Sequence, residues 1–235
     1  NKKVDVYTYD LNFNPVEAQI RFKCLDDSCY IGSTADEGGE AVLSEEFPAC
    51  VNGFIVATAE GYAQAKYQIS TNREDVANIV MKKKYELGLD LGSGVDRAMI
   101  VFSGQDYSTT VLYPETNTIE LVDDYYNVTV YVYDDSSLSF AEVKRTECVE
   151  VSDAGLTGLL GMTHDECYDI VIPAFDIENA VVGGGKVSEY ITEGELYESR
   201  ELNINVPLFE TPTSLESLQE NYNLVDSEYV YLDFE

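Results

Sequence analysis

Short runs in which apolar and polar residues alternate occupy most of the first 84 residues. In one run, Ala18, Ile20 and Phe22 alternate with polar neighbours, and this period of two is typical of a β-strand with one buried face. Similar runs cover residues 4–9, 30–34, 40–44, 53–59, 64–69 and 76–82. Their regular spacing predicts an antiparallel β-sandwich. Residues 4–9 are expected at an exposed edge of a sheet, where they would accept or donate a strand between subunits.

The pattern restarts after the basic run 82–84, which continues into residues 85–89 without a Pro, Ser or Gly spacer. Strand-like runs follow at 98–103, 107–112, 118–122 and 127–133. The chain is therefore predicted to be mainly β, with tandem antiparallel sandwich domains at residues 1–84 and 85–235 and a rigid joint between them.

The last hundred residues add a hairpin and one or two short helices to this plan. A long strand pair is expected over residues 139–172, and its loop carries Leu156, Leu159, Leu160 and Met162, either as a core plug or as a contact patch. Thr213 and Glu216 form a predicted capping box, after which Leu215, Leu218 and Tyr222 share one helix face. A final strand is predicted at 229–234. The sequence 183–186, Gly-Gly-Gly-Lys, lacks the spacing and context of a phosphate-binding loop.

The formal charge of −30 lies almost entirely in the second part of the chain. Residues 1–84 carry nine Lys/Arg against thirteen Asp/Glu, net −4, whereas residues 85–235 carry five against thirty-one, net −26. Such a field repels phosphates, which excludes a nucleic-acid partner. The negative charge instead attracts cations such as Ca²⁺ or a basic surface on a partner protein. The alternative is that the charge serves only solubility or adaptation to salt.

Five cysteines indicate an oxidising compartment. Cys148 and Cys167 flank a glycine-containing loop that a disulfide would close. Cys24, Cys29 and Cys50 allow one further pair and one leftover thiol, which is either buried or paired with another segment or chain. A zinc site built on these three would need a fourth ligand.

Acidic pairs in expected loops are the candidate calcium ligands, because Ca²⁺ takes carboxylate oxygens from such loops; the alternative is that they are plain turn residues. The pairs are Asp26 with Asp27, Asp123 with Asp124, and Asp134 with Asp135. Asn127 begins a glycosylation sequon.

Catalytic motifs are not recognised. His164 is the single histidine, and its neighbours Asp165 and Glu166 alternate in direction on an extended chain, so a catalytic or metal cluster is not favoured. No apolar run reaches the length of about 20 residues that spans a bilayer. The chain is therefore predicted not to be an enzyme and to contain no membrane span.

The order of three motifs resembles the carboxypeptidase regulatory-like, transthyretin-like sandwich, a group that also includes prealbumin-like and starch-binding-like folds. The motifs are Pro15-Val16-Glu17-Ala18, Thr34-Ala35-Asp36-Glu37-Gly38 and Glu60-Gly61-Tyr62. Motifs between residues 140 and 235, including Glu147-Cys148-Val149-Glu150 and Gly158-Leu159-Leu160-Gly161, are similar to a family of predicted surface proteins of small-genome archaea. These resemblances imply an accessory domain of a secreted or cell-surface protein, without catalytic residues.

Two functions follow as expectations. The first is a noncatalytic structural or adhesive segment of an extracellular or cell-surface protein, whose partners are other domains or subunits of a surface assembly. The second is a carbohydrate-binding module that stacks glycans on Tyr107 or Tyr125, with Tyr126 and Tyr131 more typical of strand core or edge; the absence of Trp counts against it.

Overall fold

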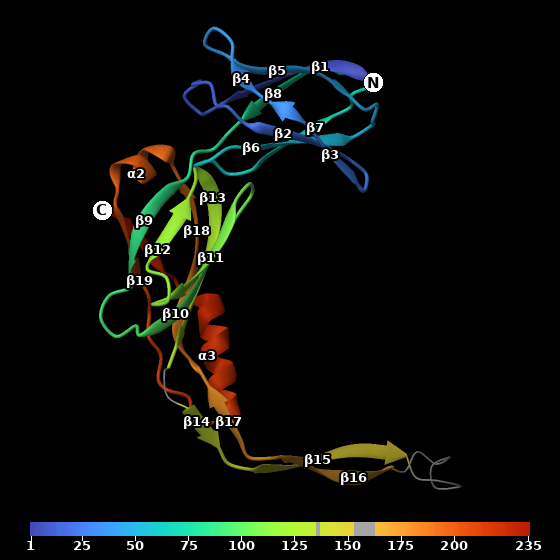
Figure 1. Cartoon of the computed structure of the whole chain (residues 1–235). Coiled ribbons are helices and arrows are strands. Elements are labelled where there is room, and N and C mark those ends of the chain that lie inside the picture. The colour runs from blue at the N-terminus through green and yellow to red at the C-terminus, as the bar shows by residue number, and fades with distance from the viewer. Residues whose placement is uncertain (135–136, 153–162) are drawn as a thin grey trace.

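The computed structural model describes residues 1–134, 137–152 and 163–235, and it is mainly β. Figure 1 shows the N-terminal part, residues 1–84, at one end of the molecule. The body of the C-terminal part lies next to it, and a two-stranded ribbon projects at the opposite end. The predicted fold class, antiparallel sandwich-like sheets with short helices near the C-terminus, is confirmed.

The N-terminal part consists of two four-stranded sheets, ordered β4-β5-β1-β8 and β3-β2-β6-β7. Alternate side chains of both sheets point inward and form one hydrophobic core, in which Phe22 and Phe47 meet edge to face at 5.4 Å. The strands are β1 (Lys2–Tyr9), β2 (Gln19–Cys24), β3 (Asp27–Ser33), β4 (Ala35–Asp36), β5 (Ala41–Phe47), β6 (Gly53–Thr58), β7 (Ala65–Ile69) and β8 (Val76–Val80).

The expected edge position of residues 4–9 is wrong. Strand β1 lies inside its sheet, antiparallel to β5 on one side and parallel to β8 on the other. Both of its backbone edges are therefore used within the chain. The sequence pattern identifies the strand, but its neighbours depend on where residues 76–80 return to the sheet.

The C-terminal part has a separate hydrophobic core between sheets ordered β11-β10-β13-β18 and β12-β9-β19-β20. Its strands are β9 (Tyr85–Asp90), β10 (Arg97–Gly104), β11 (Ser108–Tyr113), β12 (Thr118–Leu121), β13 (Asp124–Tyr133), β18 (Val181–Ile191), β19 (Glu201–Asn205) and β20 (Tyr231–Phe234). Sequence reasoning missed β9, β18 and β19. Helix α2 (Glu193–Glu198), which follows β18, was also not located; it begins with a capping box between Thr192 and Glu195.

Helix α3 (Leu215–Ser227) packs against β18, as Figure 1 shows. Its N-cap is Ser214, whose hydroxyl accepts a hydrogen bond from the Ser217 backbone, so the predicted Thr213–Glu216 box is displaced by one residue. The buried face is centred on Asn221 and Val225, whereas Tyr222 is 43% exposed.

The run Gly183–Gly185 lets the chain segments around β18 approach its backbone closely. A Cβ at Gly183 would lie 2.8 Å from the Pro207 carbonyl oxygen, and one at Gly185 would lie 2.8 Å from that of Glu228. The three glycines therefore allow the segments that contain Pro207 and Glu228 to pack closely on β18.

Beyond the body, the chain continues as two successive hairpin ribbons (Figure 1). Strands β14 (Ser137–Phe140) and β17 (Phe175–Glu178) pair first, and β15 (Val143–Ser152) and β16 (Thr163–Ile172) pair next. The predicted strand pair over 139–172 is thus present. The loop residues Leu156, Leu159, Leu160 and Met162 lie outside the described residues.

Candidate functional site

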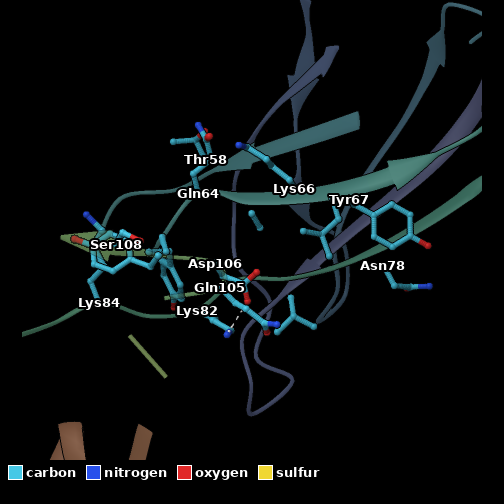
Figure 2. A pocket seen from close by; sticks show the side chains of 16 residues that line it. Thr58, Gln64, Lys66, Tyr67, Asn78, Lys82, Lys84, Gln105, Asp106 and Ser108 are labelled. Atoms are coloured by element: carbon cyan, nitrogen blue, oxygen red, sulfur yellow. Dashed lines mark ion pairs between the residues drawn. The ribbon is translucent and has the colours of Figure 1, made fainter. Parts of the chain in front are cut away.

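A groove of about 690 Å³ lies where the N-terminal and C-terminal parts meet. One side is formed by the outer strands β7 and β8, and the other by the turn Gln105–Ser108 between β10 and β11. Lys66, Lys82 and Lys84 line it, although the chain contains only 14 Lys and Arg residues. Figure 2 shows these lysines around the groove, with Asp106 beside Lys82.

Lys82 connects the two parts through carboxylates of the C-terminal part. Its Nζ lies 2.8 Å from Asp106 Oδ2 and 3.6 Å from Asp124 Oδ1. Asp124 is nearly fully buried, and its carboxylate also accepts hydrogen bonds from the backbone N–H groups of Asp106, Tyr107 and Tyr125. A buried carboxylate with this many donors is fixed in position, and it holds the ammonium group in place through a charge-assisted contact.

Lys84 makes a second connection of the same kind. Its Nζ donates to Glu120 Oε2 at 3.0 Å and lies 5.3 Å from the centre of the Tyr107 ring. The hydrogen bond with Glu120 raises the pKa of Lys84. Two of the three groove lysines are therefore neutralised by carboxylates of this chain, so the groove is a joint rather than a site for an anion.

Glu193, at the start of α2, fastens the joint at a second place. Its carboxylate accepts hydrogen bonds from Asn12 Nδ2 at 3.2 Å and from the Tyr85 hydroxyl at 2.9 Å. Its backbone N–H donates to Asp123 Oδ2 at 2.9 Å. Burial, together with the hydrogen bond to Glu193, raises the pKa of Tyr85, which keeps this hydroxyl a donor. Asn12 belongs to the N-terminal part, so this contact again links residues far apart in sequence.

Within the described residues, the structure does not bring the acidic pairs together. Asp26 and Asp27 are exposed at the turn between β2 and β3, while Asp123 and Asp124 serve the joint. Asp134 follows β13, and Asp135 lies outside the described residues. Within residues 1–134, 137–152 and 163–235, no three His, Cys, Asp or Glu side chains are close enough to hold a metal ion.

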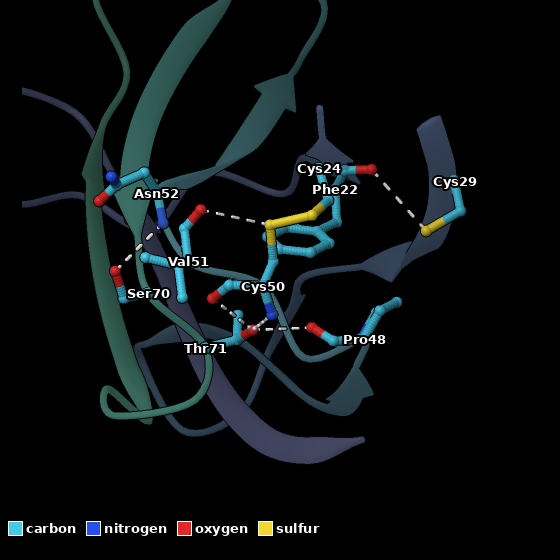
Figure 3. Close-up of a disulfide and its surroundings, with 9 residues drawn as sticks. All are labelled: Phe22, Cys24, Cys29, Pro48, Cys50, Val51, Asn52, Ser70 and Thr71. Atoms are coloured by element: carbon cyan, nitrogen blue, oxygen red, sulfur yellow. Dashed lines mark hydrogen bonds between the residues drawn. A yellow bond between two sulfur atoms is a disulfide. The ribbon is translucent and has the colours of Figure 1, made fainter. Parts of the chain in front are cut away.

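Two disulfides use four of the cysteines. Cys24 and Cys50 are bonded, which joins the end of β2 to the segment after β5 and thus connects the two sheets of the N-terminal part (Figure 3). Cys29 is free and exposed on β3. A zinc site made of these three cysteines is therefore excluded. Cys148 and Cys167 are bonded directly across the β15–β16 ribbon.

The candidate sugar-stacking tyrosines lie in different settings. Tyr107 is half-buried in the groove, whereas Tyr125 is 46% exposed and lies opposite Tyr190, which is 53% exposed on β18. Sequence reasoning missed Tyr190 because it missed β18. Tyr126 is fully buried against Phe102.

Two remaining sequence expectations concern the surface. Asn127 of the sequon is exposed, and its Oδ1 accepts a hydrogen bond from Ser188 at 2.6 Å. In the described part of the chain, no helix has the length and apolar character needed to cross a membrane.

Comparisons with family models, curated proteins and solved structures do not identify a family for this chain. No family model matches the chain, and no curated protein matches it. A solved structure of a streptococcal ancillary pilin aligns with 13% identity and a TM-score of 0.24, over 56% of this chain and 52% of the pilin. The chain thus matches about half the length of that pilin, at a similarity too low to support a conclusion about fold or function.

Proposed function

We propose that this chain is a noncatalytic structural or adhesive segment of a secreted or cell-surface protein. Two β-sandwich domains, residues 1–84 and 85–235, act as a rigid spacer that carries the β15–β16 ribbon at its far end. We further propose that residues 1–84 form a carboxypeptidase regulatory-like domain; two facing four-stranded sheets with the quoted motifs support this assignment.

The observation that carries the proposal is the joint. Lys82 is held by Asp106 and by the buried Asp124, and Glu193 accepts from Asn12, so charged and polar contacts fix the two parts from two directions. The two disulfides support an oxidising location outside the cytoplasm. A chain of net charge −30 is also suited to remaining soluble on a crowded surface.

Small-angle X-ray scattering of the full chain at low concentration tests the spacer. A rigid joint predicts a narrow set of inter-domain distances that matches the elongated shape in Figure 1. A broad distribution typical of hinge motion between the two parts would contradict the proposal.

A carbohydrate-binding role is the second candidate, and one observation favours it. Tyr125 and Tyr190 lie opposite each other on adjacent strands with both rings about half exposed, which provides an aromatic surface of the size of a sugar ring. A glycan array tests it with Tyr125→Ala, and Tyr197→Ala serves as the control because Tyr197 is 73% exposed elsewhere on the surface. Binding that is lost only with Tyr125→Ala supports this role; no glycan bound by the unaltered chain rejects it.

A further inference from the structure

The β15–β16 ribbon has two chemically different faces. Residues directly opposite each other in an antiparallel pair point to the same side, so the rungs alternate between the faces. One face carries the disulfide and the hydrogen bond from Thr146 to Asp169. The other, called here the apolar ribbon face, contains Arg145, Glu147, Val149, Val151, Glu166, Tyr168, Ile170 and Ile172.

The described residues leave the apolar ribbon face largely uncovered. Val149, Tyr168 and Ile170 are 49%, 51% and 44% exposed. An isolated two-stranded hairpin is at most marginally stable in water, and here a disulfide stabilises it from the opposite face. The chain thus holds a projecting ribbon in shape while leaving a row of apolar side chains in solvent, as expected of a contact surface.

A matching surface exists in the N-terminal part, on the outward side of the sheet β3-β2-β6-β7, which in Figure 1 is the sheet nearer the C-terminal part. The register places Arg21 beside Tyr30 and Val56, and places Lys23 beside Phe54. Its members, called here the basic face, are Gln19, Arg21, Lys23, Ser28, Tyr30, Ser33, Phe54, Val56, Thr58, Lys66 and Gln68. They include three cations, no carboxylate and two exposed aromatic rings, Tyr30 at 55% and Phe54 at 41%.

The three cations of the basic face differ from Lys82 and Lys84 in having no carboxylate partner within the described ranges, although Lys66 also lines the groove at the joint. Across the described residues, no carboxylate lies within ion-pair distance of Arg21, Lys23 or Lys66. A basic surface without its own counter-charges, on a chain of net charge −30, favours an acidic partner. The apolar ribbon face carries Glu147 and Glu166 against Arg145, and Arg145 already contacts Glu147, so Glu166 is the carboxylate that this face offers to a cation.

We propose that the apolar ribbon face of one copy packs on the basic face of a second copy, which joins the chains head to tail. The inference rests on the proposed structural function and names its partner. Val149, Tyr168 and Ile170 would meet Phe54, Tyr30 and Val56, and Glu166 would meet the unpaired cations. In Figure 1 the body of the C-terminal part separates the ribbon from the N-terminal part that carries the basic face, so the two surfaces do not meet within one copy.

The geometry also sets the kind of assembly and its strength. Two different surfaces form the contact, so each added copy leaves a free surface at either end and the series stays open. A ten-residue ribbon is about 33 Å long, and its face would bury on the order of 1,000 Å² in total, the lower limit for a specific interface. We therefore expect association in the micromolar range, strengthened where many copies share one surface.

Sedimentation velocity of the full oxidised chain over about a hundredfold range of concentration tests this proposal. The unaltered chain should pass from monomer to dimer and to larger species. Ile170→Asp on the apolar ribbon face and Phe54→Asp on the basic face should each abolish association. Their matched controls are Val171→Asp, 48% exposed on the disulfide face, and Val76→Asp, 43% exposed on the other sheet, and both should associate normally.

Mixing the two defective variants gives the decisive result. Ile170→Asp retains an intact basic face and Phe54→Asp retains an intact ribbon, so an equimolar mixture should form dimers and nothing larger. This recovery also shows that both variants are folded. Monomers at every concentration, an unaltered chain that stops at the dimer, loss of association with Val171→Asp, or a mixture that stays monomeric would each overturn the head-to-tail contact. The scattering test of the rigid joint is performed on monomers, so it stands or fails separately.

Discussion

Lys82 Nζ lies 3.6 Å from Oδ1 of Asp124, and the two residues belong to different parts of the chain. The Asp124 side chain is 3% exposed and that of Lys82 is 21% exposed, so solvent screens this pair only partly. The ammonium group also contacts Asp106 at 2.8 Å. Lys82 is therefore a principal contact that holds the N-terminal part against the C-terminal part, together with the hydrogen bond from Asn12 to Glu193.

Replacing Lys82 with Met should weaken the joint. The substitution keeps the length of the side chain but removes both contacts of the ammonium group, and charge-assisted contacts of this kind contribute about 1–3 kcal/mol. We expect this loss in the free energy of unfolding by urea, together with a broader distribution of inter-domain distances in X-ray scattering.

Lys2→Met is the matched control for that measurement. Lys2 Nζ lies 3.9 Å from Asp75, whose side chain is 71% exposed, so removing this surface pair should change the free energy of unfolding by about 0.5 kcal/mol or less. Equal effects of the two substitutions would show that the joint does not depend on Lys82.

Gly184→Ala should destabilise the C-terminal part. Gly184 has φ of +140°, and a Cβ there would meet the Val130 carbonyl oxygen and lie 2.9 Å from Val225 Cγ2 of α3. Backbone strain and overpacking together should cost about 3 kcal/mol, measured by thermal or denaturant unfolding.

Gly194→Ala separates this effect from a general cost of replacing glycine. A Cβ at Gly194 would approach only Thr192 Oγ1, at 3.9 Å, within the first turn of α2. Alanine has the higher helix propensity, so this variant should be neutral or slightly more stable. If Gly184→Ala were equally harmless, the close packing of α3 on β18 would be wrong.

Asp10 should make the stability of the N-terminal part depend on pH in the acidic range. Burial alone would raise the pKa of Asp10, but hydrogen bonds from Asn14 and Asn12 and the charge of Lys83 outweigh burial and lower it below 3.8. A carboxyl group whose pKa falls on folding stabilises the protein above its unfolded pKa, and this contribution disappears as the pH falls through the folded pKa.

The difference in unfolding free energy between the unaltered chain and Asp10→Asn should therefore be largest above about pH 4 and shrink at lower pH. Denaturant unfolding at a series of pH values measures it. A difference that stays constant from neutral to strongly acidic pH would mean that ionised Asp10 does not contribute.

The two disulfides should have separate effects. Replacing Cys24 and Cys50 with Ser should lower the unfolding free energy of the N-terminal part by about 3 kcal/mol, because this bond connects two packed sheets across 26 residues. Replacing Cys148 and Cys167 should leave the body unchanged and increase amide hydrogen exchange in residues 143–152 and 163–172, which have no second layer to stabilise them. Global destabilisation by the second pair of substitutions would show that the ribbon is part of a core.

Local patterns in the sequence were enough to find most strands of the N-terminal part. Ala18, Ile20 and Phe22 alternate with polar residues, and the structure buries all three, with Ile20 and Phe22 in β2 and Ala18 directly before it. Alternation of apolar and polar residues is lost where both sides of a strand are covered. The first half of strand β18 shows no alternation, because α3 and neighbouring segments pack on it and bury Gly183, Gly184 and Gly185 in succession.

Helix α3 shows a smaller failure of the same kind. Leu215, Leu218 and Tyr222 have helical spacing, but the face that packs is centred on Asn221, whose Nδ2 donates to the carbonyl oxygens of Val181 and Glu210. A buried asparagine is favourable only where those carbonyl groups are within reach. The Val181 carbonyl belongs to β18, which is 40 residues from Asn221 in sequence, so its position is decided by the tertiary fold.

The amino-acid sequence by itself determined that this chain is mainly β, that its charge is concentrated after residue 84, and that its strands have one apolar face, because these properties depend on residues that are neighbours along the chain. Tertiary structure decided which strands lie inside a sheet, which acidic residues serve the joint, and which face of the ribbon stays uncovered. Those outcomes depend on contacts such as Lys82 with Asp124 and Asn12 with Glu193, whose partners meet only after the chain folds.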